Sequence, residues 1–360
     1  MFCVMEAGHS GRVWRGRGVA DNPGNRFEHT RFDPDPEWEA DEERSAPRTQ
    51  FLPDLSQSII TRNDSPDVGF DRSLNPYRGC EHGCTYCYAR PTHEYLGFSS
   101  GLDFETRIMV KERAPDLLRE ALVKPRWDPG VLVMSGVTDP YQPVERKLEI
   151  TRGCLRVLAE FRNPVAIVTK NHLVTRDIDL LSELATHRAA AVFVSVTTLD
   201  PVLARVMEPR TTSPEHRLDA IRRLAAAGIP VGVMTAPIVP GLTDHEIPKL
   251  LESAAEAGAS FAGYTVLRLP HAVKELFETW LETHLPKKKD RVLARLREMR
   301  GGKLNDARFG SRMRGEGVFA EQIRDLFRVA RSRAGLDHPV PELSVEAFRK
   351  PGGRQMELFE

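Results

Sequence analysis

Three of the five cysteines in this 360-residue sequence lie within eight positions, at Cys80, Cys84 and Cys87. Their spacing is Cys-x3-Cys-x2-Cys, and Gly79 and Gly83 lie beside or between them. Glycine lets a backbone wrap closely around an inorganic cluster, and thiolates are the usual ligands of iron–sulfur clusters. Three thiolates bind three irons of a cubane and leave the fourth iron open to a small molecule. The spacing therefore favours a [4Fe–4S] cluster that does chemistry rather than only passing electrons.

Two other readings of the cysteines remain open. Positions i, i+4 and i+7 would share one helix face, which would make the thiols core residues, although Pro76 and the two glycines disfavour a helix. A structural zinc site would need a fourth ligand, for which His82 and His93 are nearby. A disulfide framework is disfavoured, because it would spread pairs along a short secreted chain. Cys3 and Cys154 have no role that the sequence reveals.

The elements that must position the cysteines begin at about residue 70. Continuous apolar runs rich in β-branched residues suit strands that are buried on both faces of a parallel sheet. Amphipathic stretches separate these runs, and strand–helix repetition at roughly 30-residue spacing is typical of βαβ units. Six units predict an α/β fold with a partial (β/α)6 TIM-type barrel, and a doubly wound sheet is the alternative. The expected strands are near 73–77 and at 130–135, 164–170, 190–197, 229–236 and 261–269.

Helical spacing is clearest in two of the intervening stretches. Leu148, Leu155 and Leu158 are expected on one face of a single helix. A later helix is expected to begin at Ser213, as N-cap, with Pro214 as its first residue. Its apolar face would carry Leu218, Ile221, Leu224 and Ala225.

Composition divides the chain into three parts. Residues 1–65 are rich in Gly, Pro, Asp and Arg, and acids occupy seven of the eleven positions in 33–43, so a flexible, largely irregular N-terminal arm is expected. Residues 66–285 form the predicted barrel. Residues 286–360 form a helical, basic C-terminal extension, in which 287–316 holds eleven Lys or Arg and four acids.

Basic and acidic residues balance at 51 each, so the net charge alone implies no polyanionic partner. No apolar run approaches the roughly 18 residues of a membrane span, and no secretory signal is evident, so a cytoplasmic protein without membrane partners is expected.

The cysteine spacing, with Tyr86 directly before the last cysteine, resembles the radical S-adenosylmethionine (SAM) superfamily. The resemblance implies a [4Fe–4S] cluster whose open iron binds the amino and carboxylate groups of SAM. It further implies that an external one-electron reductant drives cleavage of SAM to methionine and a 5′-deoxyadenosyl radical, which abstracts hydrogen from a substrate. The cofactor supplies this chemistry, and the protein positions it and excludes water. An iron–sulfur electron-transfer or binding protein without SAM turnover is the alternative.

The same resemblance implies SAM contacts at successive strand ends, where barrel sites form. Thr138 and Asp139 follow the second strand, where the superfamily holds the SAM amino group, although the Gly-Gly-Glu form is absent. Lys170 suits the SAM carboxylate, and Ser195 and Thr197 suit the ribose. The segment from Ile238 to Gly241 resembles the one that contacts adenine. Tyr88, Arg90 and His93 could line the mouth of the site. The candidates for a catalytic role are Tyr88 and Arg210, and Arg210 could hold a carboxylate or phosphate or form an ion pair at a helix end.

Residues from about 70 to 270 further resemble the spore photoproduct lyase-like branch, which is often labelled DNA repair photolyase-related. The resemblance rests on the residues around Cys84–Tyr88, on 138–141 and on the strand that ends at Lys170. One departure matters: the lyase uses a cysteine near the second-strand motif as a hydrogen donor, and this sequence has Gly136 there. The resemblance to this branch and the basic segment 287–316 make nucleic acid a candidate partner. Because the donor cysteine is missing, reversal of a thymine dimer is not expected.

Overall fold

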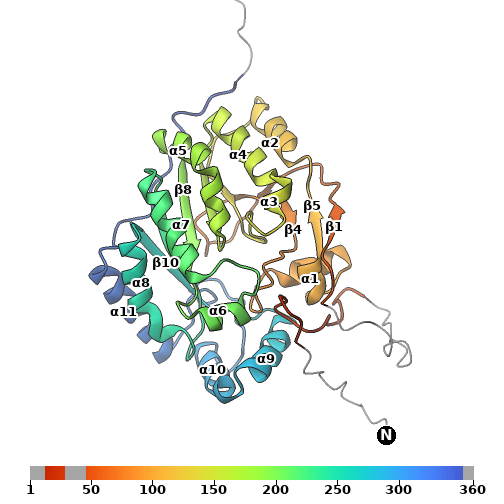
Figure 1. The fold of residues 1–360 in the computed structure, drawn as a ribbon, viewed down its shortest axis with the longest axis vertical. Helices are drawn as coiled ribbons and strands as arrows, with labels where there is room; N and C mark the ends of the chain where they lie inside the picture. Colours follow the sequence, from red (N-terminus) through yellow and green to blue (C-terminus); the bar gives the residue numbers. More distant parts are fainter. Residues whose placement is uncertain (1–12, 29–45, 352–360) are drawn as a thin grey trace, which may run out of the picture.

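The computed structural model describes residues 13–28 and 46–351, which form a mixed α/β fold (Figure 1). Its main sheet has seven strands in the order β10-β9-β8-β7-β6-β3-β2. Every neighbouring pair from β3 to β10 is parallel, and β2 at the edge is antiparallel to β3. The strands are β2 (Ile60–Arg62), β3 (Arg72–Leu74), β6 (Leu132–Met134), β7 (Val165–Thr169), β8 (Ala190–Ser195), β9 (Val231–Ile238) and β10 (Phe261–Val266).

All six expected strands are present, and each lies within about three residues of its predicted bounds. In β8 the side chains are buried on both faces of the sheet, as the neighbouring residues Ala191 and Val192 illustrate. A second, three-stranded sheet has the order β1-β5-β4 and was not expected. Its strands are β1 (Gln50–Pro53), β4 (Tyr77–Arg78) and β5 (Arg107–Val110).

Helices connect the strands and pack on the sheet, while α6 lies with α9 and α10 at one end of the molecule (Figure 1). The α-helices are α1 (Leu102–Thr106), α2 (Ala114–Val123), α3 (Glu145–Leu148), α4 (Ile150–Phe161), α5 (Ile178–Thr186), α6 (Pro201–Met207), α7 (Pro214–Ala226), α8 (Ile247–Glu256), α9 (Val273–His284), α10 (Pro286–Met299) and α11 (Val318–Arg333). Short 3₁₀ helices are η2 (Arg90–Leu96), η3 (His172–Asp177) and η4 (Asp244–Glu246). Among the described helices, none is long and apolar enough to cross a membrane.

One helical prediction is confirmed and one is wrong. Ser213 caps α7 by accepting a hydrogen bond from the His216 amide, and Ile221 and Leu224 are buried. Leu148, however, does not share a helix with Leu155. The chain adopts a left-handed conformation at Glu149, with φ of 54°, which ends α3 before α4 begins and leaves Leu148 at the surface.

The N-terminal residues that the structure describes are packed rather than free. Val19 is buried in a small apolar cluster with Leu102 and Leu276, and the Gly18 amide donates to the Glu105 carboxylate at 3.0 Å. Strands β1 and β2 also fall within the expected arm. Composition did not indicate this, because the contacts depend on single residues and not on an apolar run. The acidic run 33–43 and Cys3 lie outside the described residues.

Residues 286–351 contain α10 and α11, and this part of the chain bridges the two ends of the main sheet. The amide of Val266 in β10 donates to Met313 O at 2.8 Å. Arg312 forms an ion pair with Asp67, which lies in the loop between β2 and β3, and the Gly310 amide donates to the same carboxylate at 2.7 Å. Residues 306–316, here called the clasp, therefore connect one edge strand of the sheet to the loop beside the other.

Candidate functional site

The three clustered cysteines lie in a loop of turns between β4 and η2, here called the cluster loop (residues 79–88). Cys80 and Cys84 are buried and Cys87 is half-buried, and all three are free thiols. The loop is not a helix, so the core-helix reading is wrong. Gly79 has φ of 77°, and a Cβ there would lie 2.9 Å from the His93 ring and 3.0 Å from Phe104 O. Only glycine fits this turn without displacing its neighbours.

The thiols are suited to a multi-iron group. Burial, followed by nearby negative groups, raises the pKa of Cys84 and of Cys87, so these thiols ionise readily only when a metal binds them. Among the described residues, no three His, Cys, Asp or Glu side chains are grouped so as to hold one metal ion. The thiolates of a cubane bind different irons and are spaced more widely than the ligands of one ion. The donor set thus fits a cluster better than a structural zinc.

Of the two histidines considered as fourth zinc ligands, His82 contacts Cys80 but also two other side chains, and His93 is engaged elsewhere. His82 Nδ1 lies 3.4 Å from the Asp139 carboxylate, and its Nε2 lies 3.2 Å from the Asn171 amide nitrogen. His93 Nε2 lies 2.9 Å from Arg107 O, between Phe98 and Phe104. His93 is fully buried, so its predicted place at the mouth is wrong.

Arg90 lies beneath the cluster loop and not at its mouth, which corrects a second expectation. It is fully buried and donates to Cys84 O at 3.0 Å and Gly83 O at 3.2 Å. Its guanidinium also pairs with Glu105 at 2.5 Å. Carbonyl groups that accept from a buried cation are held in one orientation, so this pair fixes the backbone on which Cys84 stands.

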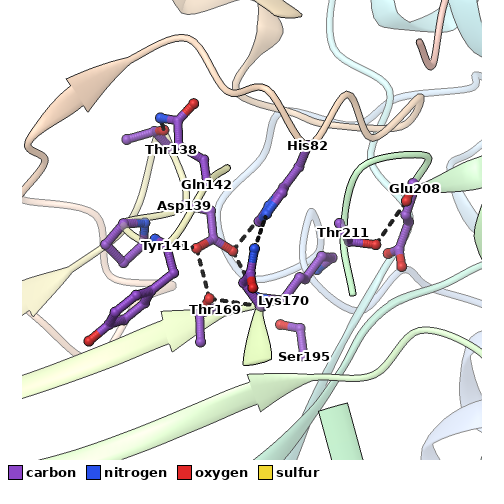
Figure 2. Close-up of polar contacts among 12 residues, drawn as sticks. His82, Thr138, Asp139, Tyr141, Gln142, Thr169, Lys170, Ser195, Glu208 and Thr211 are labelled. Atoms are coloured by element: carbon purple, nitrogen blue, oxygen red, sulfur yellow. Dashed lines mark hydrogen bonds and ion pairs between the residues drawn. The ribbon is translucent and has the colours of Figure 1, made fainter. Parts of the chain in front are cut away.

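Thr138 and Asp139 join the ends of β6 and β7 to the cluster loop (Figure 2). The Thr138 hydroxyl donates to Gly79 O at 2.8 Å. The Asp139 carboxylate accepts from the Thr169 hydroxyl and the Lys170 amide, each at 2.7 Å, and faces His82. Burial alone would raise the pKa of Asp139, but His82 and these hydrogen bonds lower it. Both residues predicted to contact SAM therefore also hold the cluster loop in place.

A buried carboxylate, Glu208, gathers residues from three further elements. It accepts from the hydroxyls of Tyr86 and Thr197 and forms a 2.5 Å ion pair with Arg217. Burial opposes its ionisation, yet Arg217 and Lys170 lower the pKa of Glu208 to about 2. The carboxylate is therefore ionised at neutral pH and fixes Tyr86, the residue directly before Cys87.

Lys170, Ser195 and Thr197 lie on adjacent strand ends, as predicted. The Lys170 ammonium donates to Ala236 O at 3.1 Å and lies 6.0 Å from the centre of the Tyr86 ring. Ser195 and Thr197 are buried, and Ser195 faces the same region as Glu208 and Lys170 (Figure 2).

The remaining candidates surround these groups. Ile238 is buried at the end of β9, and the carbonyl of Gly241 accepts from Arg291 at 2.6 Å. Arg210 pairs with Glu81 at 3.0 Å, which matches the ion-pair alternative. Tyr88 is 49% exposed, and its hydroxyl donates to Gly136 O at 2.5 Å. Tyr88 therefore lies at the accessible side of the loop.

Sequence reasoning missed four residues that shape the site: His82 as a partner of Asp139, Gln142, Glu208 and Arg217. Gln142 accepts from the Glu81 amide at 2.9 Å and donates to Gly79 O at 3.3 Å, so it holds both ends of the turn around Cys80. The one available signal was the position of Arg217 on the apolar face of α7, where a cation needs a buried partner.

Comparison with known proteins agrees with this geometry. The model of the Radical SAM superfamily matches residues 74–254, which is half of the chain. An uncharacterized protein of Mycobacterium tuberculosis is 38% identical over 232 residues, covering 64% of this chain and 67% of the relative. A radical SAM Nalpha-GlyT isomerase of Pseudomonas phage M6 is 25% identical over 224 residues, covering 61% of this chain and 42% of the isomerase.

Solved structures share the fold. Spore photoproduct lyase complexed with dinucleoside spore photoproduct superposes with a TM-score of 0.54 at 16% identity, covering 79% of each chain. At this identity the likeness concerns the fold alone. It accords with the predicted α/β architecture and its parallel sheet.

Proposed function

The chain belongs to the radical SAM superfamily, whose members use a [4Fe–4S] cluster and SAM, and on this premise we propose that Cys80, Cys84 and Cys87 are its cluster ligands. The cluster, when bound, supplies the electron that cleaves SAM to methionine and a 5′-deoxyadenosyl radical. The protein is thus an enzyme, and we propose that the radical abstracts hydrogen from a substrate that enters beside Tyr88.

One observation carries the assignment of the ligands. The three free thiols lie in a single loop of turns that is hydrogen-bonded to residues following β6, β7 and β8. Sites of α/β barrels form at the carboxyl ends of the strands. We infer that the six parallel strands form an open (β/α)6 barrel over residues 66–285, with the cluster at its mouth and residues 286–360 as an extension.

We propose that SAM lies along the same strand ends. Lys170 is the candidate partner of its carboxylate, and Ser195 and Thr197 are candidates for the ribose. The segment from Ile238 to Gly241 is the candidate for adenine. Thr138 and Asp139, with Tyr86, are proposed to position the cluster and the SAM amino group together, because each contacts the cluster loop or belongs to it.

Nucleic acid is our proposed substrate class. The basic segment 287–316 supports this proposal, since clustered Lys and Arg neutralise phosphates. The solved relative holds a dinucleoside photoproduct. Gly136 stands where that branch keeps a donor cysteine, so the proposal does not extend to reversal of a thymine dimer.

The test is anaerobic reconstitution followed by dithionite and SAM. Wild type is expected to bind four irons per chain and to form 5′-deoxyadenosine, whereas Cys80→Ala is expected to lose both. Cys154→Ala is the matched control, because Cys154 is buried in α4, in a different apolar cluster from Cys80 and Cys84. A Cys80→Ala protein that keeps its cluster and its SAM cleavage would overturn the assignment. A wild type that binds the cluster without forming 5′-deoxyadenosine would favour an electron-transfer or binding protein.

A further inference from the structure

Arg268 is a partly buried cation beside the mouth of the site that has no carboxylate partner within ion-pair distance among the described residues. It lies two residues beyond β10, between the cluster loop and the clasp. Its guanidinium carbon is 5.4 Å from the centre of the Tyr88 ring. Within residues 13–28 and 46–351, its Nη1 donates only to the Met313 thioether, at 3.5 Å, and sulfur is a weak acceptor. Its Nε is buried without a hydrogen-bond partner.

The surroundings of Arg268 do not compensate its charge. Burial and the neighbouring Arg312 lower the pKa of Arg268, and Tyr88 and Asp67 oppose this only in part. Asp67 is already engaged by Arg312 and by the Gly310 amide. Arg300 adds a further positive charge nearby. This corner of the mouth therefore carries an excess of positive charge.

Arg300 offers an internal comparison, because it is more deeply buried than Arg268 and its Nε likewise has no hydrogen-bond partner, yet its two Nη groups are engaged. Its Nη groups donate to the carbonyls of Leu267, Ser311 and Arg312 at 2.8–3.1 Å. These bonds attach the clasp to the end of β10, which gives the buried Arg300 side chain a structural role. Among the described residues, no comparable set of carbonyl acceptors gives Arg268 such a structural role.

We propose that Arg268 binds an oxyanion of the substrate, a phosphate ester or a carboxylate, and so sets the substrate class of this enzyme. The inference rests on the proposed function. A desolvated cation is costly unless an anion pairs with it, and a guanidinium can donate two parallel hydrogen bonds to one oxyanion. Contact with the Tyr88 ring places that oxyanion next to the residue that directly follows Cys87.

The oxyanion is not the carboxylate of SAM, for which Lys170 is the proposed partner. Lys170 lies at the end of β7, and two strands, β8 and β9, separate β7 from β10 in the sheet. An experiment in the presence of saturating SAM therefore separates the two possibilities.

The test measures modification of arginine by phenylglyoxal in the anaerobically reconstituted wild-type protein, with SAM saturating and ionic strength held constant with chloride. Peptide mass spectrometry reports Arg268 and Arg308 separately. Arg308 belongs to the clasp but is paired with Asp306 and Glu316. Inorganic phosphate, a thymidine dinucleotide and acetate are the probes. At least one is expected to slow modification of Arg268 several-fold and to leave Arg308 unchanged.

Each result decides the proposal. Protection by phosphate and the dinucleotide alone assigns a phosphate ester, and protection by acetate alone assigns a carboxylate. Unchanged modification of Arg268 with all three probes overturns the proposal, as does protection that disappears once SAM is added. In a second arm, the protecting probe is expected to raise the melting temperature of wild type and of Arg308→Gln but not of Arg268→Gln. Neither arm needs turnover, so failure to form 5′-deoxyadenosine would refute the proposed function independently.

Discussion

Arg90 and Glu105 form an ion pair of 2.5 Å in which both side chains are fully buried, directly beneath the loop that carries the cysteines. The same guanidinium donates to the backbone at Gly83 and Cys84. The pair therefore connects the stability of the fold to the shape of the cluster loop.

Replacing Arg90 by Met is expected to be strongly destabilising. Glu105 would remain as a buried, uncompensated charge, at a cost of about 3–5 kcal/mol. Urea unfolding of the cluster-free protein measures this cost, and iron content after reconstitution is expected to fall with it. Arg119→Met is the control, since its pair with Glu160 is exposed and is expected to contribute no more than about 1 kcal/mol. Equal losses in the two variants would contradict the prediction.

Gly18 is expected to tolerate no side chain. A Cβ at Gly18 would lie 1.7 Å from Gly83 O, so the N-terminal segment or the cluster loop must move. Gly18→Ala is expected to cost about 1–3 kcal/mol, as overpacking typically does, and to reduce the iron bound per chain. Gly24→Ala is the matched control, because nothing lies within 4 Å of a Cβ there. Full iron occupancy in Gly18→Ala would show that these contacts do not matter for the cluster.

His93 is expected to make the fold sensitive to mild acid. Burial lowers the pKa of His93 from 6.5 to about 4, so below pH 6.5 the unfolded chain binds a proton that the folded chain does not. Stability is therefore full above pH 6.5 and falls as the pH drops toward 4, by about 3 kcal/mol in total from this group.

The measurement for His93 is the free energy of unfolding in urea at several pH values between 4 and 7.5. His93→Gln can still donate to Arg107 O but does not titrate, so its stability is expected to fall less steeply than that of wild type in this range. Other groups titrate in both proteins, and the difference between the two curves isolates His93. Parallel curves would argue against the lowered pKa.

Glu208 and Arg217 are expected to be energetically coupled. Glu208→Gln would leave the Arg217 cation buried without a charged partner, at a cost of about 3–5 kcal/mol. Adding Arg217→Met removes that cation, so the double variant is expected to be more stable than the sum of the single effects, by about 1–3 kcal/mol. A double-mutant cycle in denaturant measures this coupling. Strict additivity would mean that the ion pair contributes nothing specific.

The sequence predicted those parts of the molecule that depend on local patterns. Five strands of the sheet were found because largely apolar runs of six to nine residues have few other structures open to them. The cysteine spacing is equally local, since all three thiols lie in one loop. The break between α3 and α4 was missed because the left-handed residue there is Glu149, and glutamate gives no signal for that conformation.

The rest of the site depends on contacts between distant residues. Tyr86, Glu208 and Arg217 come from three separate elements, and nothing in the spacing of such residues reveals that they meet. The packing of Gly18 on Gly83 is similar: a small residue in a polar segment indicates flexibility, whereas here it permits two backbones to touch. Such contacts become visible only when the chain is folded.

The clasp has a consequence for the order of events during synthesis. The hydrogen bond between Gly310 and Asp67 joins residues 243 positions apart, and contacts of such long range form late. A ribosome that adds about 5–20 residues per second would need roughly 10–50 s after making the β2–β3 loop to deliver the clasp. During that time Cys80, Cys84 and Cys87 have already been synthesised, but the sheet still lacks the contacts that the clasp makes. We therefore expect iron and sulfide to be loaded onto the finished polypeptide and not onto the nascent chain.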